Sequence, residues 1–176
     1  MKDKVLPSVV LTLICVISAV LLVFSHELTK DRISEQKENK FNESVEALFG
    51  ECDSKLIDDN FGKDEVQAIA VTSDGKTAIQ VVTDGYSKGG INILVGIDEN
   101  GALSGIDFVA LGETPGLGSK VRDIESFRKQ FIGITEAPED VDAISGATFS
   151  SKGMRNAVAV AMDVYNENKE AILSGR

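Results

Sequence analysis

Hydrophobic and polar positions follow three different patterns along the chain of 176 residues. Residues 6–24 contain no charged side chain. From residue 66 to residue 110, short apolar runs alternate with turn-forming residues. From Ser150 onward, apolar residues recur every three or four positions. These patterns predict, in order, a membrane-spanning helix, a group of β-strands and an amphipathic helix.

The first segment is long enough to cross a lipid bilayer. At about 1.5 Å per residue, a helix over residues 6–24 comes close to the ~30 Å thickness of the hydrocarbon layer. A cleaved signal peptide is the alternative, but its apolar part is usually about 7–15 residues long and ends in a small-x-small site. The sequence Val23-Phe24-Ser25 does not fit such a site. We therefore expect an uncleaved transmembrane anchor over residues 5–25.

The residues that flank this segment predict its orientation. Lys2 and Lys4 favour a cytoplasmic N-terminus of residues 1–4, and a long acidic domain crosses the membrane largely regardless of its charge. We expect the soluble part on the extracytoplasmic side of the cell (inner) membrane. Residues 26–50 predict a helical stalk that ends at Gly50, and residues 51–176 form one domain.

The remaining pattern predicts a small α+β domain. Four runs at residues 66–72, 77–83, 91–97 and 102–110 read as strands, with turn signals at 73–76 and 98–101 that indicate two antiparallel hairpins. A helical stretch is expected at residues 119–131. The C-terminal helix begins at Ser150, and one of its faces is apolar: Met154, Ala157, Val158, Ala161, Met162, Tyr165 and Ile172. The expected fold is a small antiparallel sheet packed against this C-terminal helix.

Composition excludes several classes of function. The net charge is −10, and no basic patch is present that could bind nucleic acid. His26 is the single histidine, which excludes multi-histidine metal sites and disfavours a catalytic triad. Cys15 and Cys52 supply neither a CxxC pair nor a zinc site of four thiolates. Cofactor chemistry must therefore come from other residues.

Three glycine-bearing joints, at residues 84–90, 111–120 and 142–151, lie between the predicted elements. Each could be an ordinary turn, since Gly, Pro, Asp and Ser favour turns. The third joint leads directly into the C-terminal helix. Its hydroxyl groups could cap the free amide groups of the helix, or those amide groups could hold a phosphate. The residues alone leave both interpretations open.

Two motifs in these joints resemble those of the covalent FMN-binding domain family: the segment SGATFSS (145–151), with Asp142 before it, and the segment GETPGLGSK (112–120). Together with the N-terminal anchor, their order resembles the G subunits of Rnf-type ion-translocating ferredoxin:NAD oxidoreductases. The turn at residues 85–91 departs from the family, because relatives often have a compact Gly-Tyr-x-Gly-Pro-Ile turn and this chain has a longer one without proline.

The resemblance implies a role for individual residues. Thr148 corresponds to the threonine that is esterified to the phosphate of FMN, and Asp142 to an acidic residue that the flavin transferase recognises. The other residues implied to bind the cofactor are Ser145, Gly146, Ala147, Ser151, Glu113, Thr114, Gly116, Leu117, Gly118 and Tyr86. No catalytic acid or base and no metal ligand is implied.

The function that the resemblance implies is electron transfer by covalently bound FMN within a membrane complex that couples ferredoxin oxidation and NAD reduction to ion movement. Its partners would be other integral membrane subunits, iron–sulfur and flavin subunits, and a flavin transferase during maturation. Two alternatives stay open: a stand-alone extracytoplasmic FMN electron carrier, and a non-enzymatic anchored module that binds a phosphate-bearing ligand.

Overall fold

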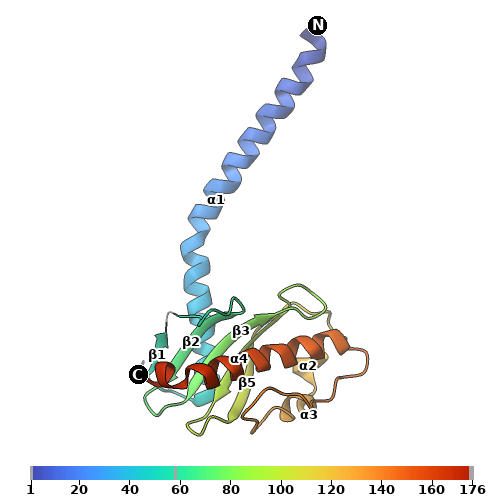
Figure 1. Ribbon diagram of the computed structural model, residues 1–176. Coiled ribbons are helices and arrows are strands. Elements are labelled where there is room, and N and C mark those ends of the chain that lie inside the picture. The colour runs from blue at the N-terminus through green and yellow to red at the C-terminus, as the bar shows by residue number, and fades with distance from the viewer. Residues whose placement is uncertain (1, 58, 175–176) are drawn as a thin grey trace. The chain divides into compact units, whose positions relative to one another are not determined.

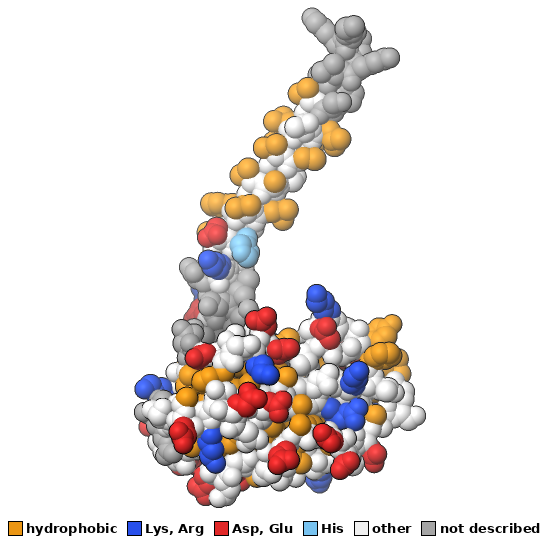
Figure 2. Space-filling view, in the orientation of Figure 1, with side chains coloured by type: hydrophobic (Ala, Val, Ile, Leu, Met, Phe, Trp, Pro, Cys, Tyr) orange, Lys and Arg blue, Asp and Glu red, His pale blue; other side chains and the backbone are white. Residues whose placement is uncertain are grey.

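A long N-terminal helix precedes a five-stranded domain in the computed structural model, which describes residues 2–57 and 59–174. Helix α1 (Lys2–Phe49) contains an apolar segment, Val9–Lys30, with a mean hydropathy of 2.6. This is the one segment among the described residues that is long and apolar enough to cross a membrane. Hydrophobic side chains surround the helix there (Figure 2). The predicted apolar helix is thus confirmed, whereas the side chains of residues 2–8, including Lys2 and Lys4, lie outside the described part.

The last nine residues of α1 belong to the folded unit Phe41–Arg176 rather than to the unit Met1–Lys40. Phe41 and Val45 are each only 3% exposed. Gly50 ends the helix with a φ of +78°, and its N–H donates to the carbonyl oxygen of Glu46 at 2.8 Å. Glycine tolerates this left-handed backbone conformation because it has no Cβ. The predicted helix end at Gly50 is confirmed.

The sheet is an antiparallel meander in the order β1-β2-β3-β4-β5 (Figure 1). Its strands are β1 (Ser54–Ile57), β2 (Val66–Thr72), β3 (Thr77–Thr83), β4 (Ile91–Ile97) and β5 (Leu103–Leu111). The four predicted strands are confirmed, with β5 shifted by one residue. Strand β1 was not predicted, because its four residues are mostly exposed at the edge of the sheet and show no apolar alternation.

Both predicted hairpins are present, and each turn contains a glycine with positive φ. Gly75 and Gly101 both have a φ of +89°. In the first turn, the Lys76 ammonium group lies 2.6 Å from the Asp74 carboxylate, and the Thr72 hydroxyl group donates to the same carboxylate. These two hydrogen bonds lower the pKa of Asp74 to about 2. The turn chemistry therefore fixes the register in which β2 and β3 pair.

Helix α4 (Thr148–Ser174) covers one face of the sheet (Figure 1). All seven residues of its predicted apolar face are fully buried. They pack in one cluster with alternate residues of the central strands, among them Ile79 and Ile93. The intervening residues Ala78 and Leu94 belong to the opposite face, where they pack with the end of α1. The sheet is therefore buried on both faces. The sequence predicted only the contact with the C-terminal helix.

The prediction of one continuous helical stretch at residues 119–131 is wrong, because two short helices lie there. Helix α2 (Lys120–Asp123) and helix α3 (Glu125–Lys129) are separated by Ile124, which is extended with a φ of −89° and a ψ of 104°. In one straight helix, Val121 and Phe127 would point in directions roughly 120° apart. The break at Ile124 allows both side chains to enter the core, where each is at most 2% exposed.

Helix α4 approaches the end of β3 closely at Gly153. A Cβ atom on Gly153 would lie 2.5 Å from the carbonyl oxygen of Asp84 and 2.9 Å from Cα of Gly85. The Thr83 hydroxyl group donates to the carbonyl oxygen of Gly153 at 2.8 Å. Glycine at this position therefore sets the distance between α4 and the joint at residues 84–90.

We expect Gly153→Ala to destabilise the protein although alanine is the better helix former. Helix propensity alone would stabilise the variant by about 1 kcal/mol. The clash with backbone atoms outweighs this gain, since an overpacked core position typically costs about 1–3 kcal/mol. Urea unfolding of the full chain, followed by circular dichroism, measures the difference. Asn156→Ala on the exposed side of α4 is the control, and a Gly153→Ala variant as stable as this control contradicts the prediction.

Candidate functional site

The three glycine-bearing joints meet around one cavity of about 340 Å³ at the beginning of α4. The joint after β3 contributes Tyr86, the joint after β5 contributes four residues, and the joint before α4 contributes the rest. The lining consists of Tyr86, Glu113, Thr114, Leu117, Gly118, Gly146, Ala147, Thr148, Phe149 and Ser150. Segments that are far apart in the sequence thus form a single site.

Most residues implied by the resemblance are brought together here. Eight of them line the cavity, and Gly116, Asp142, Ser145 and Ser151 do not. Ser151 is fully buried, and its Oγ accepts a hydrogen bond from the N–H of Ile144 at 3.0 Å. Asp142 is exposed, and its N–H donates to Oε1 of Gln130 at 3.0 Å. The side chain of Ser151 therefore holds the joint in place from behind.

The Glu113 carboxylate connects all three joints. The side chain follows β5 and is 7% exposed. Its oxygens accept hydrogen bonds from the N–H groups of Tyr86 at 3.3 Å and Ser87 at 3.1 Å, and from the hydroxyl group of Ser150 in α4. Burial of a carboxylate is costly unless hydrogen bonds replace the lost water. These three donors supply that replacement and fix the joints relative to one another.

Glycines leave the space that the Glu113 carboxylate occupies. A Cβ atom on Gly85 would lie 2.5 Å from Oε1 of Glu113, and a Cβ atom on Gly90 or Gly118 would lie closer still to one of the two oxygens. These glycines have negative or extended backbone angles, so the reason for them is space rather than backbone strain. Close packing around one acidic group thus explains these three glycines of the joints.

The joint before α4 brings Thr148 to the first position of the helix. Gly146 has a φ of +79°, which allows the chain to turn into the helix. The carbonyl oxygen of Ala147 accepts the first helical hydrogen bond, from Ser151 at 2.8 Å. Ala147 has no side-chain oxygen that could cap the helix. The exposed Thr148 side chain therefore lies at a helix end that carries a partial positive charge.

The joint after β5 is held by its own hydrogen bonds. The carbonyl oxygen of Thr114 accepts from the N–H groups of Leu117 at 3.1 Å and Ser119 at 3.2 Å. The N–H of Gly116, which has a φ of +75°, donates to Oγ of Ser119 at 2.9 Å. This compact turn leaves the Leu117 side chain 52% exposed at the cavity. Leu117 gives the site part of its apolar character.

Sequence reasoning missed two residues that line the cavity, Phe149 and Ser150. Both lie inside the segment SGATFSS, immediately after Thr148. Phe149 directly follows Thr148, and this position could have indicated that it lines the site. The hydrogen bond from Ser150 to Glu113 spans 37 residues of sequence, so no local pattern could indicate it.

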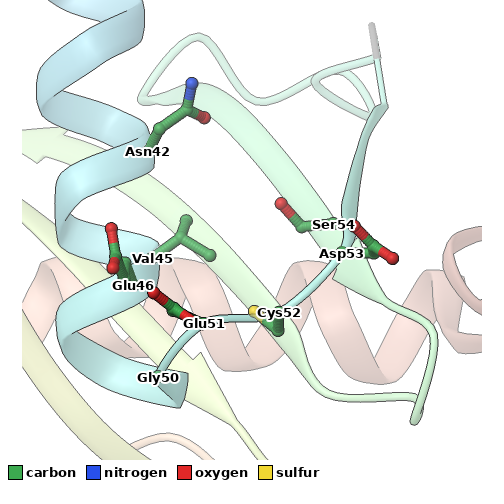
Figure 3. A pocket seen from close by; sticks show the side chains of 8 residues that line it. All are labelled: Asn42, Val45, Glu46, Gly50, Glu51, Cys52, Asp53 and Ser54. Carbon is green, nitrogen blue, oxygen red and sulfur yellow. The ribbon is translucent and has the colours of Figure 1, made fainter.

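A second and larger hollow, of about 600 Å³, lies between the end of α1 and β1 (Figure 3). Its lining includes Glu46, Glu51, Asp53 and Cys52. Cys52 is exposed, but partial loss of solvent around its thiol, followed by the nearby negative charge of Asp74, raises the pKa of the thiol and keeps it protonated. Among the described residues, no cluster of His, Cys, Asp and Glu could hold a metal ion. The cavity at α4 is therefore the stronger candidate.

We expect Glu113→Gln to loosen the joint at residues 84–90. A glutamine amide has one acceptor oxygen and one donor nitrogen, so at least one of the three donors loses its partner. An unsatisfied buried group costs about 1–3 kcal/mol. The measurement is amide hydrogen exchange at Tyr86 and Ser87, together with the melting temperature. Faster exchange and a lower melting temperature are expected; exchange equal to that of the exposed control Glu136→Gln would contradict the role of Glu113.

Comparison with known proteins places the chain in a family. Residues 85–163 match the family described as FMN-binding domain. The chain is 31% identical to the G subunit of the ion-translocating oxidoreductase complex of Aliivibrio fischeri strain MJ11, over 95% of this chain and 92% of that protein. It is 29% identical to the protein of the same name from Shewanella baltica strain OS223, over 93% and 90% of the two chains.

A third relative carries a more specific name. The G subunit of the Na⁺-translocating ferredoxin:NAD⁺ oxidoreductase complex of Acetobacterium woodii is 32% identical over 47% of this chain and 45% of that protein. The similarity to the Aliivibrio protein extends over nearly the full length of both chains, the apolar helix included. The chain belongs to the family of G subunits of ion-translocating oxidoreductase complexes.

Proposed function

We propose that this chain is a membrane-anchored flavoprotein subunit that carries FMN on Thr148 through a phosphate ester. In this role it passes electrons within an ion-translocating ferredoxin:NAD oxidoreductase complex. The observation that carries the proposal is the position of Thr148, which is exposed, lines the cavity and begins helix α4. The match to the FMN-binding domain family covers residues 85–163. This range includes all three joints of the site except residue 84.

The residues of the cavity fit such a group. A volume of about 340 Å³ lies within the usual range of about 300–1,000 Å³ for cofactor and ligand sites. Tyr86, Leu117 and Phe149 offer apolar surface for an aromatic ring system. Thr148 offers the hydroxyl group, and Gly146 leaves open space beside it, since a Cβ atom there would meet nothing within 4 Å. A phosphate at Thr148 would be stabilised by the amide groups of the helix end.

Attachment requires an external enzyme, because a threonine hydroxyl group is a weak nucleophile unless a base activates it. Among the residues that the structure describes, those that line the cavity include no histidine or lysine that could act as this base. In the proposed transfer, Oγ1 of Thr148 forms a new bond to the flavin-side phosphorus of a nucleotide flavin donor. The phosphoanhydride bond of the donor breaks, a nucleoside monophosphate leaves, and the threonine proton passes to solvent. The transferase would supply the base for this step.

Bound FMN would supply the redox chemistry, while the protein supplies position and environment. Glu113 holds the three joints together behind the cavity through its hydrogen bonds. Thr148 keeps the group from being lost, which matters on the extracytoplasmic side where free FMN is dilute. No residue of the chain needs to act as an acid or base in electron transfer itself.

The anchor follows from α1. Residues 5–25, which include most of the apolar segment Val9–Lys30, would cross the membrane, and the domain would lie on the extracytoplasmic side with the short N-terminus in the cytoplasm. Such an anchor keeps the flavin close to other membrane subunits of the complex. Residues 26–50 would then act as the stalk and residues 51–176 as the covalent FMN-binding domain.

We expect Thr148→Ala to abolish covalent flavin in protein that is co-expressed with the transferase. The measurement is fluorescence of the band in a denaturing gel under ultraviolet light, followed by mass spectrometry of the peptide that contains residue 148. Thr148→Ser should keep part of the label, because serine offers a hydroxyl group at nearly the same place. Full labelling of Thr148→Ala, or an unlabelled wild type, contradicts the attachment. Co-purification with other membrane subunits separates a member of a complex from a stand-alone carrier.

We propose that the transferase recognises the side chain of Asp142. Its side chain is exposed, six residues before Thr148. We expect Asp142→Asn to lower the labelled fraction without a change in melting temperature, because the recognised carboxylate is lost while the backbone hydrogen bond to Gln130 persists. Asp140→Asn, at another exposed carboxylate, is the matched control. Equal labelling of the two variants would remove Asp142 from the recognition motif.

A further inference from the structure

Two aromatic side chains at the mouth of the cavity are far more exposed than is usual for their type. Tyr86 is 75% exposed and Phe149 is 67% exposed. In the described part of the folded unit, five large hydrophobic side chains are exposed, and three of them line this cavity: Tyr86, Leu117 and Phe149. Figure 2 shows hydrophobic side chains gathered at one end of the domain. Grouped apolar exposure of this kind marks a surface that something covers.

The two rings contact each other in a defined geometry. Their centroids are 6.3 Å apart, and the ring planes meet at 69°. This is an edge-to-face arrangement, which is favourable for aromatic pairs. In such an arrangement, the edge of one ring points at a face of the other, so a further ring can still pack against the pair. Tyr86 and Phe149 thus form an aromatic corner that joins the joint at residues 84–90 to helix α4.

The backbone beneath this aromatic corner is fixed by the same carboxylate. The N–H of Tyr86 donates to Glu113, and the residue after Phe149, Ser150, donates to Glu113 through its hydroxyl group. Phe149 also directly follows Thr148 at the start of α4. The rings are therefore held on rigid supports, beside the proposed point of attachment, while their surfaces stay open.

On the basis of the proposed function, we infer that Tyr86 and Phe149 form a wall against which the isoalloxazine ring of FMN packs. An isoalloxazine ring is flat and aromatic, and its two faces are apolar. Such a face can pack against the apolar surface that the aromatic corner and Leu117 expose. The attachment at Thr148 brings the ring to Phe149 without a long tether. Both aromatic residues act as positioning residues, because they touch the ring but take no part in bond making.

This wall has a consequence for the redox properties of the site. The electron-rich phenol ring of Tyr86 interacts better with the electron-poor oxidised flavin than with the electron-rich reduced flavin. Packing against the wall therefore favours the oxidised form and lowers the reduction potential. A phenol group held against the flavin would also quench the fluorescence of the native protein, because it can donate an electron to an excited flavin and recover it with no net reaction.

The test compares flavin fluorescence of the native full chain with that of the same sample after denaturation. The chain is co-expressed with the transferase and purified in detergent as Tyr86→Leu, Phe149→Leu and Tyr86→Phe variants. Phe61→Leu is the matched control, since Phe61 is partly buried and does not line the cavity. Denatured fluorescence reports covalent attachment, and the native-to-denatured ratio reports packing. Visible circular dichroism and the reduction potential are recorded for each variant.

We expect Tyr86→Leu and Phe149→Leu to raise the native-to-denatured ratio, to weaken the flavin circular dichroism and to raise the reduction potential. Tyr86→Phe should raise the ratio but keep the circular dichroism, because it removes the oxidisable phenol group and keeps the ring. Phe61→Leu should match the wild type in all three measurements.

Two contrary results have different meanings. A wild type without denatured fluorescence overturns covalent attachment, and with it the wall. Labelled Tyr86→Leu and Phe149→Leu variants that match Phe61→Leu in ratio, circular dichroism and potential overturn the wall alone. The covered surface would then be the contact face of a protein partner, and the proposed attachment would stand.

Discussion

The buried carboxylate of Glu113 is the constraint on which the site depends. A carboxylate that is 7% exposed must replace its lost hydration with hydrogen bonds, and here the donors come from two other segments of the chain. Meeting this need draws the joint at residues 84–90 and the start of α4 toward the joint after β5. This approach is sterically possible because Gly85, Gly90 and Gly118 have no Cβ atom that would overlap the carboxylate. The cavity is the space that remains on the outer side of this arrangement.

The sheet supplies the rigid support behind these joints. Its strands are buried on both faces, by α4 on one side and by the end of α1 on the other. Gly153 lets α4 lie against the end of β3, and Gly96 and Gly105 leave room for Leu48 and Phe49 of α1. Loops held by such a scaffold can keep a precise shape although they lack regular structure. The position of Thr148 is therefore a consequence of packing in the core.

Local pattern was sufficient for most of the fold. Short apolar runs between turn-forming residues identified four strands, and the 3.6-residue period identified the buried face of α4. The local pattern did not predict β1, which is short and exposed. It also did not predict the break at Ile124, which exists because Val121 and Phe127 both enter the core. It also missed that residues 41–49 pack on the sheet, since the charged stalk before them shows little apolar periodicity.

The sequence by itself determined the apolar segment of α1, the two hairpins of β2 to β5, the glycine-bearing joints and the motifs around Thr148, because all of these are encoded in neighbouring residues. Only the tertiary structure decided that the joints share one cavity, that Ser151 faces the interior and that Phe149 meets Tyr86. These features depend on contacts between segments separated by tens of residues. Such contacts are set by the close approach of Gly153 in α4 to the end of β3 and by the hydrogen bonds of Glu113. Neither of these leaves a periodic pattern in the sequence.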